Sequence, residues 1–212
     1  MDIRDRILDA AKKVYAQHGF RGATTRLIAI EAGVNEVTLF RTFGSKAALF
    51  EALMDAHAAQ TAIMELPDAP VDPEREMTEW CAAMLSHMRE NSALIRTSFG
   101  EVEERPEAAV SMCEGPNCAG TMLRDYVQRL YDAGFVAEDG DAPAAVAMLM
   151  SAMFGDAISR SVMPSAFPQP ESDAPGRYVR VFMRALGIKG RAAHRTRPTL
   201  AHPPLRRSAA GD

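Results

Sequence analysis

The side chains with the clearest chemical potential lie close together, between Asn35 and Arg41. If a short helix begins after Asn35, its outward side chains are Glu36, Val37, Thr38 and Arg41. An arginine can donate two hydrogen bonds to O6 and N7 of guanine, and valine or threonine methyl groups can contact the methyl group of thymine. The set therefore suits a helix that reads base edges in the major groove of DNA.

A tight turn precedes this helix and fixes its orientation. Ala32 is small, so two helices can approach each other, and Gly33 can adopt a positive φ at little cost. Val34 and Leu39 are apolar and are expected to face inward, where they set the crossing angle. Two short helices joined in this way form a helix-turn-helix unit.

The flanking segments carry start and stop signals for further helices. Apolar residues recur at three- and four-residue spacing over Ile3–His18, and Gly19 follows where a helix often ends in the left-handed conformation. Either Thr24 or Thr25 can cap the helix before the turn, and Ser45 can cap a longer helix after it. These signals predict a head of short helices.

The spacing of apolar residues is helical along nearly the whole chain, and alternating β-branched runs are absent. Further helices are predicted over residues 74–90, 91–102, 106–114, 116–133, 143–162 and 176–186. Prolines mark a linker over 67–73 and a loop over 164–175, and a turn is expected at 114–117. The predicted fold class is therefore all-α.

An ordered series of short motifs fills the first 55 residues. Its members are Arg6–Ala11, His18–Phe20, Thr24–Ala29, Ala32–Val34, Thr38–Phe40 and Phe43–Leu49. The series resembles the TetR/AcrR family of transcription regulators, and beyond it the likeness is one of helix lengths and of the closing segment 177–187. The resemblance implies a helix-turn-helix DNA-binding domain over residues 1–50 and a helical ligand-binding and dimerisation domain over 51–188. Residues 189–212 are basic and rich in Pro and Ala, so a disordered tail is expected there.

The resemblance also implies roles for single residues. Thr25 and Lys46 match positions that hold phosphates at the starts of their helices, where free N–H groups favour anions. Phe40 and Thr42 depart from the family, which commonly has Tyr at the first position and often Tyr or another polar aromatic at the second, so more of the anchoring is expected from Thr25, Arg26 and Lys46. The predicted DNA-binding residues are Thr25, Arg26, Asn35, Glu36, Val37, Thr38, Phe40, Arg41, Thr42 and Lys46.

Several of these residues have a plainer alternative. Thr25 could serve only as a helix cap, Phe40 only as packing and Arg26 only as a solvated surface charge. Glu36 repels phosphate unless it accepts a hydrogen bond from the amino group of cytosine.

The middle of the chain is rich in flexible and aromatic side chains, and the family encloses a small-molecule pocket in this region. The predicted pocket residues are Trp80, Met84, His87, Met88, Phe99, Met112, Met122 and Tyr126. Thirteen methionines suit a surface that repacks around a small apolar or amphipathic ligand. The alternative is that this set is ordinary core, because methionines at helical spacing usually are.

Residues 144–162 are apolar on all sides of the predicted helix, so that helix must be buried on all sides. One face can pack on its own chain and the other on a second copy. Together with an apolar stripe on residues 176–186, the helix over 144–162 predicts a homodimer joined by a four-helix bundle. Such a dimer reads a palindromic operator. The alternative is that both helices complete the core of a monomer.

The net charge of −4 is unevenly distributed. Residues 1–55 hold 8 basic and 7 acidic side chains, residues 56–176 hold 7 and 20, and residues 177–212 hold 9 and 1. The acidic middle argues against a protein that coats nucleic acid along its whole length. An alternative is an architectural or unspecific DNA-binding protein that binds DNA through the basic tail.

The sequence offers no secretory signal, and its apolar run over 144–154 is too short to cross a bilayer, so a cytoplasmic protein without a membrane partner is expected. Cys81, Cys113 and Cys118 do not form a disulfide framework or a usual zinc pattern. The rival class, an all-α thiol or metal hydrolase, would need an activated nucleophile or a ligand cluster, and none is evident. We therefore predict no cofactor, no metal and no enzyme activity. The sign of regulation, repressor or activator, stays open, with repressor more frequent in the family.

Overall fold

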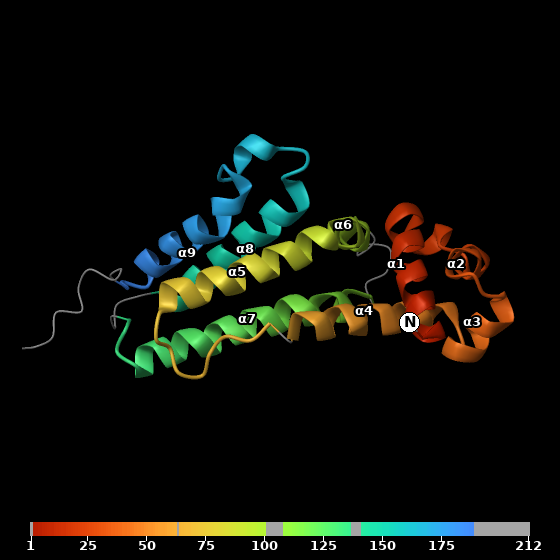
Figure 1. Ribbon diagram of the computed structural model, residues 1–212, viewed down its shortest axis with the longest axis horizontal. Helices are drawn as coiled ribbons and strands as arrows, with labels where there is room; N and C mark the ends of the chain where they lie inside the picture. Colours follow the sequence, from red (N-terminus) through yellow and green to blue (C-terminus); the bar gives the residue numbers. More distant parts are fainter. Residues whose placement is uncertain (1, 63, 101–107, 137–140, 189–212) are drawn as a thin grey trace, which may run out of the picture.

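Helix follows helix along the chain, and no strand occurs in the part that the structure describes (Figure 1). The structure, a computed structural model, describes residues 2–62, 64–100, 108–136 and 141–188. Its α-helices are α1 (Ile3–Gly22), α2 (Thr25–Ala32), α3 (Glu36–Phe43), α4 (Lys46–Ala62), α5 (Pro73–Glu90), α6 (Ser92–Gly100), α7 (Ala108–Asp132), α8 (Ala142–Ser159) and α9 (Ala174–Ala185). Two 3-10 turns, η1 (Pro164–Ala166) and η2 (Glu171–Asp173), join the last two. The predicted all-α class is confirmed.

The caps of the head helices follow from single side chains. Of the two possible caps of α2, the structure selects Thr24, whose hydroxyl accepts from the Leu27 amide at 3.2 Å. Gly19 does take the predicted positive φ, 65°, but it only kinks α1, and the helix continues to Gly22. The Ser45 hydroxyl accepts from the Ala48 amide at 3.1 Å, as its predicted capping role requires.

The turn between α2 and α3 has the expected geometry. Gly33 lies at φ 64°, and the Val34 amide donates to the Ala29 carbonyl at 3.0 Å, which closes the end of α2. Leu39 is fully buried beneath α3. An additional tie comes from α1, because the Arg6 guanidinium donates to the Ala32 carbonyl at 2.6 Å. The helix-turn-helix unit is thus fixed both by its own core and by a side chain 26 residues away.

Two apolar cores stabilise the molecule. The first lies among α1, α2, α3 and the start of α4, and the second among α5, α7, α8 and α9. Figure 1 shows the first group at one end of an elongated body, with α4 leading from it alongside α7. The first core also includes Leu53 of α4 and Leu94 of α6, so it does not stop at residue 50. The domain boundary drawn there stays a prediction.

One expected break is wrong. Residues 114–117 were predicted to form a turn between two helices, but α7 runs without interruption from Ala108 to Asp132. Pro116 removes one amide hydrogen from the helix, a cost that packing of α7 against α4 and α8 can offset. The end of α7 was predicted correctly, since Gly134 follows it at φ 76°. The predicted disordered tail, 189–212, lies outside the described residues.

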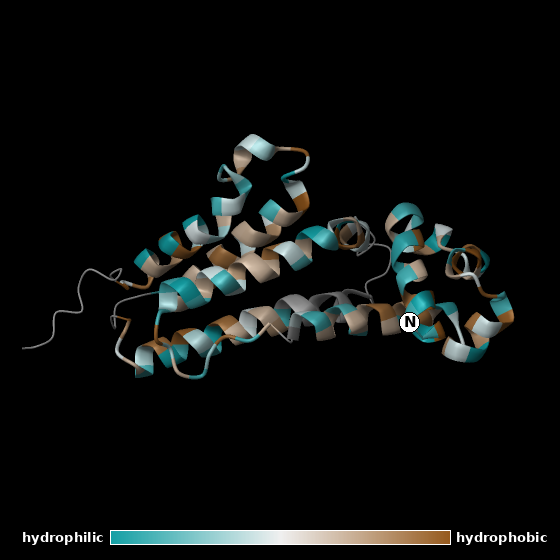
Figure 2. Cartoon of the chain, in the orientation of Figure 1, coloured by the Kyte–Doolittle hydropathy of each residue, from teal (hydrophilic) through white to brown (hydrophobic). Residues whose placement is uncertain are grey.

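The helix α8 is the most apolar part of the body (Figure 2). By length and composition alone it would pass as a membrane span, and it is the only described helix that does so. That is weak evidence, because core helices of soluble proteins have the same composition. Only about a third of the window is buried by its own chain, so α8 keeps an apolar face that the described residues do not cover.

Candidate nucleic-acid interface and ligand cavity

The start of α3 is rigidly organised around Asn35. The Asn35 side-chain oxygen accepts from the Thr38 amide at 2.7 Å and from the Thr38 hydroxyl at 2.8 Å, so the predicted cap is confirmed. Val37, with 73% of its surface exposed, and Arg41 then lie on the solvent face. An apolar side chain so exposed beside a cation is available for contact with a base and its methyl group.

Thr25 and Glu36 contact each other across the turn. The Thr25 hydroxyl donates to the Glu36 carboxylate through a short hydrogen bond, and both residues are half-buried. The carboxylate also sits in the first turn of α3, where the helix dipole stabilises negative charge. This pair, 11 residues apart in sequence, explains an acidic residue near the expected phosphates, and sequence spacing alone did not reveal it.

The remaining predicted contacts lie on the same end of the molecule. Arg26, Arg41 and Thr42 are exposed, and Phe40 keeps 44% of its surface in solvent. The Thr42 hydroxyl donates to the Thr38 carbonyl at 2.8 Å. The Lys46 ammonium lies 4.4 Å from the Phe20 ring centre and donates to the Phe20 carbonyl. All ten predicted DNA-binding residues are therefore brought onto α2, α3 and the beginning of α4.

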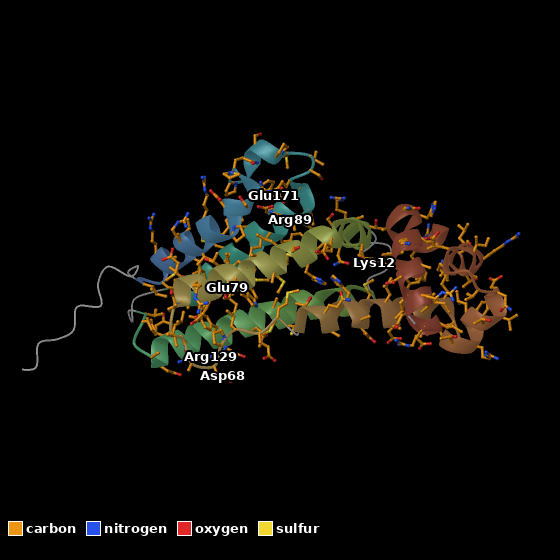
Figure 3. All side chains as sticks on the ribbon, viewed as in Figure 1. Lys12, Asp68, Glu79, Arg89, Arg129 and Glu171 are labelled. Carbon is orange, nitrogen blue, oxygen red and sulfur yellow. The ribbon has the colours of Figure 1, made fainter. Side chains whose placement is uncertain are left out.

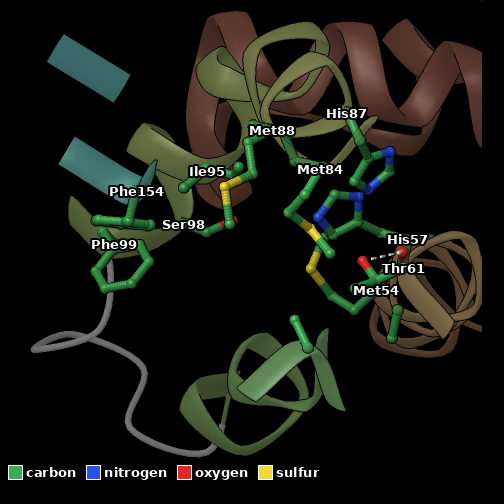
Figure 4. A pocket seen from close by; sticks show the side chains of 13 residues that line it. Met54, His57, Thr61, Met84, His87, Met88, Ile95, Ser98, Phe99 and Phe154 are labelled. Atoms are coloured by element: carbon green, nitrogen blue, oxygen red, sulfur yellow. Dashed lines mark hydrogen bonds between the residues drawn. The ribbon is translucent and has the colours of Figure 1, made fainter. Parts of the chain in front are cut away.

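A cavity lies between α4, α5 and α6, close to the head. The cavity is partly open to solvent. Four of the eight predicted pocket residues line it: Met84, His87, Met88 and Phe99 (Figure 4). Nine of the thirteen described residues that line it are apolar, and a mostly apolar lining with a few polar groups is typical of sites for small organic ligands.

The other predicted pocket residues do not meet this cavity. The Trp80 indole donates to the Met64 carbonyl at 2.8 Å, and Tyr126 is fully buried with its hydroxyl on Glu76. Met122 packs against the body core. The Met112 side chain lies outside the described residues. A ligand-binding role for these residues stays a prediction, and in the structure Trp80, Met122 and Tyr126 belong to the body core or pack against it. Helical spacing identifies an inward face without telling core from hollow.

Sequence analysis missed the contribution of α4. Met54, His57, Ala58 and Thr61 all line the cavity, and their spacing of three, one and three residues places them on one helix face. The His57 ring stacks on the His87 ring with centroids 4.7 Å apart. Burial, with help from His87 and Lys12, lowers the pKa of His57 to about 4, so this ring is neutral near pH 7.

The cavity is connected to the head through α6. Ser98 lines the cavity, and its hydroxyl donates to the Tyr15 hydroxyl of α1 at 3.2 Å. Thr97, its neighbour, donates to the Ala16 carbonyl at 3.2 Å. Leu94 lines the cavity and also belongs to the core of the head. Movement of α6 would therefore reach α1 through direct contacts.

A buried ionic cluster joins α5 to the last helices of the body, and two of its members, Arg89 and Glu171, are labelled in Figure 3. The fully buried Asp156 carboxylate accepts from Arg89 and Tyr178 at 2.7 Å each and is paired with Arg160. Burial would raise the pKa of Asp156, but the hydrogen bonds from Arg160, Arg89 and Tyr178 outweigh it and lower the pKa to about 2. Arg89 also pairs with Glu171 at 2.8 Å, so α5, α8, α9 and η2 are joined.

Among the described residues, no group of three or more His, Cys, Asp or Glu side chains could hold a metal ion. Two free cysteines lie in this part of the chain, the buried Cys81 and the partly exposed Cys118. Cys81 is buried beside Met153, and burial raises the pKa of its thiol to about 12. A thiol of that kind is unreactive near neutral pH.

Comparison with known proteins agrees with the fold and with the helix-turn-helix unit. The model of the bacterial regulatory proteins of the tetR family matches residues 7–53. An uncharacterized HTH-type transcriptional regulator of Bacillus subtilis, YvkB, is 30% identical over 156 residues, which cover 73% of this chain and 81% of YvkB. The HTH-type transcriptional repressor SCO4008 of Streptomyces coelicolor is 31% identical over 96 residues, covering 45% of this chain and 47% of the relative.

The fold is shared with solved structures of regulators. That of the flavonoid-responsive regulator FrrA has a TM-score of 0.62 at 22% identity and covers 86% of this chain and 96% of FrrA. The match to YvkB over most of both chains, together with the family match at the helix-turn-helix unit, makes the protein a transcription regulator and not an enzyme. The chain belongs to the tetR family of bacterial regulatory proteins.

Proposed function

We propose that this regulator is a cytoplasmic homodimer that represses transcription from a palindromic operator and is released by a small apolar or amphipathic ligand. The observation that carries the proposal is the shared position of Leu94 and Ser98. Both line the cavity, and both contact the head that carries the reading helix. A ligand that moves α6 would therefore act on α1 without an intermediary.

The predicted DNA contacts divide into two kinds. Val37, Thr38 and Arg41 are proposed to contact base edges, since they lie along the outward side of α3. Thr25, Arg26, Phe40, Thr42 and Lys46 are proposed to contact phosphates or pack beside them. Asn35 supports the reading helix by capping it, and Glu36 supports it by joining it to Thr25.

The uncovered face of α8 supports the dimer. Its members are Ala144, Ala147, Met148 and Ser151, all exposed and spaced by three or four residues. On α9, Val181 is exposed as well, with 59% of its surface in solvent. Small residues beside one methionine allow two copies of α8 to approach closely across a two-fold axis. Burial of this face in a four-helix bundle would stabilise the dimer.

Release follows from linkage between the two sites. Suppose that a ligand binds best to an arrangement of the body in which the distance between the two heads does not match the operator. Linkage then requires that the ligand lowers operator affinity. The two reading helices must meet half-sites about one helical turn apart, so a small change in separation weakens binding. The names of SCO4008, a repressor, and FrrA, a flavonoid-responsive regulator, favour repression and ligand response for this relative of theirs.

Selection of binding sites from a random pool of duplexes tests the function. Wild-type protein at near-physiological salt should recover a palindrome, and Arg41→Ala should lose preference at one base pair in each half-site, with a fall in affinity of about tenfold or more. A matched control is Arg124→Ala, an exposed arginine on α7. Equal binding by wild type and Arg41→Ala, with a steep salt dependence, would instead support unspecific binding through the basic tail.

A further inference from the structure

The cavity has two histidines at one end and two phenylalanines at the other. His57 and His87 lie together at the first end, Phe99 and Phe154 lie at the second with ring centroids 5.0 Å apart, and methionines lie between (Figure 4). Phe99 keeps 52% of its surface in solvent, whereas His87 keeps only 8%. The histidine end is therefore the deep end, and the phenylalanine end is the open one.

The hydrogen bonds of Asn91 determine which nitrogen of His87 carries its proton. The Asn91 amide nitrogen donates to the His87 carbonyl at 2.7 Å and lies 3.4 Å from the His87 Nδ1 atom. Because an amide nitrogen only donates, Nδ1 acts as the acceptor and the proton of the neutral ring lies on Nε2. This Nε2 atom is buried and has no hydrogen-bond partner among the described residues. Nδ1 of His57 is in the same situation.

The charges near the histidines favour an anion. Among the described residues that line the cavity, none carries a carboxylate or an ammonium group. Lys12 of α1 acts on both rings, and it disfavours a second positive charge there. Glu90 acts on His87 alone, from the last turn of the same helix. A buried donor under the influence of a lysine is best satisfied by a ligand atom that accepts and carries negative charge.

We infer that the cavity takes a monoanionic amphiphile, with an acid head group that accepts a hydrogen bond from Nε2 of His87 beside His57 and an apolar body along the methionines and phenylalanines. The inference rests on the proposed function, because it names the chemical class of the ligand that releases the operator. The head group lies at the deep end and accepts the hydrogen bond that Nε2 of His87 can donate. The apolar body fills the half of the cavity nearer to solvent.

Binding of three probes with the same ten-carbon chain tests this class: decanoate, 1-decanol and decyltrimethylammonium, by calorimetry at pH 7.5 with the full-length protein. Decanoate should bind about tenfold or more tightly than either other probe, since a hydrogen bond to a charged group is the difference. His87→Leu should lower decanoate affinity by about the same factor and leave 1-decanol affinity nearly unchanged. His87→Gln, which can present an amide donor near the Nε2 position, should recover part of the loss.

The controls keep the outcome decisive. His18→Leu, at an exposed histidine of α1, should bind decanoate as the wild type does. If His87→Leu does not fold, as judged by its thermal unfolding, His57→Leu serves in its place. Equal affinity for decanoate and 1-decanol, or an equal loss of both in His87→Leu, would overturn the inference.

The operator recovered by selection separates this failure from failure of the proposed function. If 1-decanol releases the operator as well as decanoate does, ligand response stands and the anionic class is wrong. If no probe binds while the operator is bound with high affinity, the inference falls and DNA reading remains. If the protein recovers no operator, the proposed function fails whatever the probes do.

Discussion

At the scale of single residues, the polar groups of the reading head are already engaged before any DNA is present. Glu36 accepts from Thr25, Asn35 from Thr38, and Lys46 donates to the Phe20 carbonyl. Arg41 and Val37 lie instead on the exposed side of α3. Specificity is therefore expected to depend more on Arg41 and Val37, and anchoring groups such as Lys46 must exchange a contact within the protein for one with phosphate.

His57 makes the stability of the protein depend on pH. Burial depresses its folded-state pKa to about 4, below the unfolded value near 6.5, so the unfolded chain binds the proton more readily. Its contribution is intact above pH 6.5 and is lost as the pH falls toward 4. Between pH 7 and pH 5 the free energy of unfolding should fall by about 1 kcal/mol more in wild type than in His57→Gln, after allowance for partial exposure. Urea denaturation at both pH values measures this, and equal falls in the two proteins would contradict it.

Asp156 is the residue whose loss should cost most in the body. Asp156→Asn leaves Arg89 and Arg160 without their shared carboxylate, and removal of one partner from a buried ionic cluster typically costs about 3 kcal/mol or more. For a protein of this size the melting temperature should fall by roughly 6–12 °C. Asp125→Asn, at an exposed position of α7, is the matched control in the same thermal scan. Similar melting temperatures for both variants would show that the cluster contributes little.

At the scale of elements, α6 is the point where the body contacts the head most directly. Its residues meet α1 through the Ser98–Tyr15 and Thr97–Ala16 hydrogen bonds, and Leu94 packs into the core of the head. The other connection, α4, is continuous with the helix-turn-helix unit and supplies His57 to the cavity. The cavity helices nearest to the head, α4 and α6, are therefore also the helices that position the head.

Ser98→Ala should weaken the α6–α1 contact. Loss of the hydroxyl leaves the buried Tyr15 hydroxyl without this hydrogen bond, so the free energy of unfolding should decrease by about 1 kcal/mol. Amide hydrogen exchange should accelerate in α1 and α6. Ser86→Ala, which removes an exposed hydroxyl bonded to Glu90, should change stability by less than about 0.5 kcal/mol. Indistinguishable urea-denaturation curves for the two variants would refute this role of α6.

At the scale of the whole molecule, the last two long helices keep part of their apolar surface exposed. The body core covers one side of α8 and α9, while Met148 and Val181 keep more than half of their surface in solvent. The head lies at the far end of the molecule from α9, so a two-fold pairing through α8 and α9 would leave both reading helices accessible (Figure 1).

Met148→Glu should dissociate the dimer. A two-fold interface would bring the new carboxylate of each copy into an apolar contact, where an unpaired charge is strongly unfavourable. Sedimentation should then report the monomer mass, and operator affinity should fall by at least tenfold. The control is Val71→Glu, at a still more exposed apolar residue in the linker before α5, and this variant should stay dimeric. A dimer mass for Met148→Glu would refute the assignment of the interface to α8.

Much of the local structure could be predicted from the sequence. Glycine and capping signals such as Gly33 and Asn35 specify turns within a few residues, and the order of motifs identified the family, because these depend only on backbone preferences and neighbours. Other features became clear only in the folded protein. Thr24 and not Thr25 caps α2, and α7 continues through Pro116. Trp80 and Tyr126 lie in the core, and the His57 ring stacks on the His87 ring from another helix. Helical spacing shows which face of a helix turns inward, but whether that face meets packed side chains or a hollow depends on how several helices fit together.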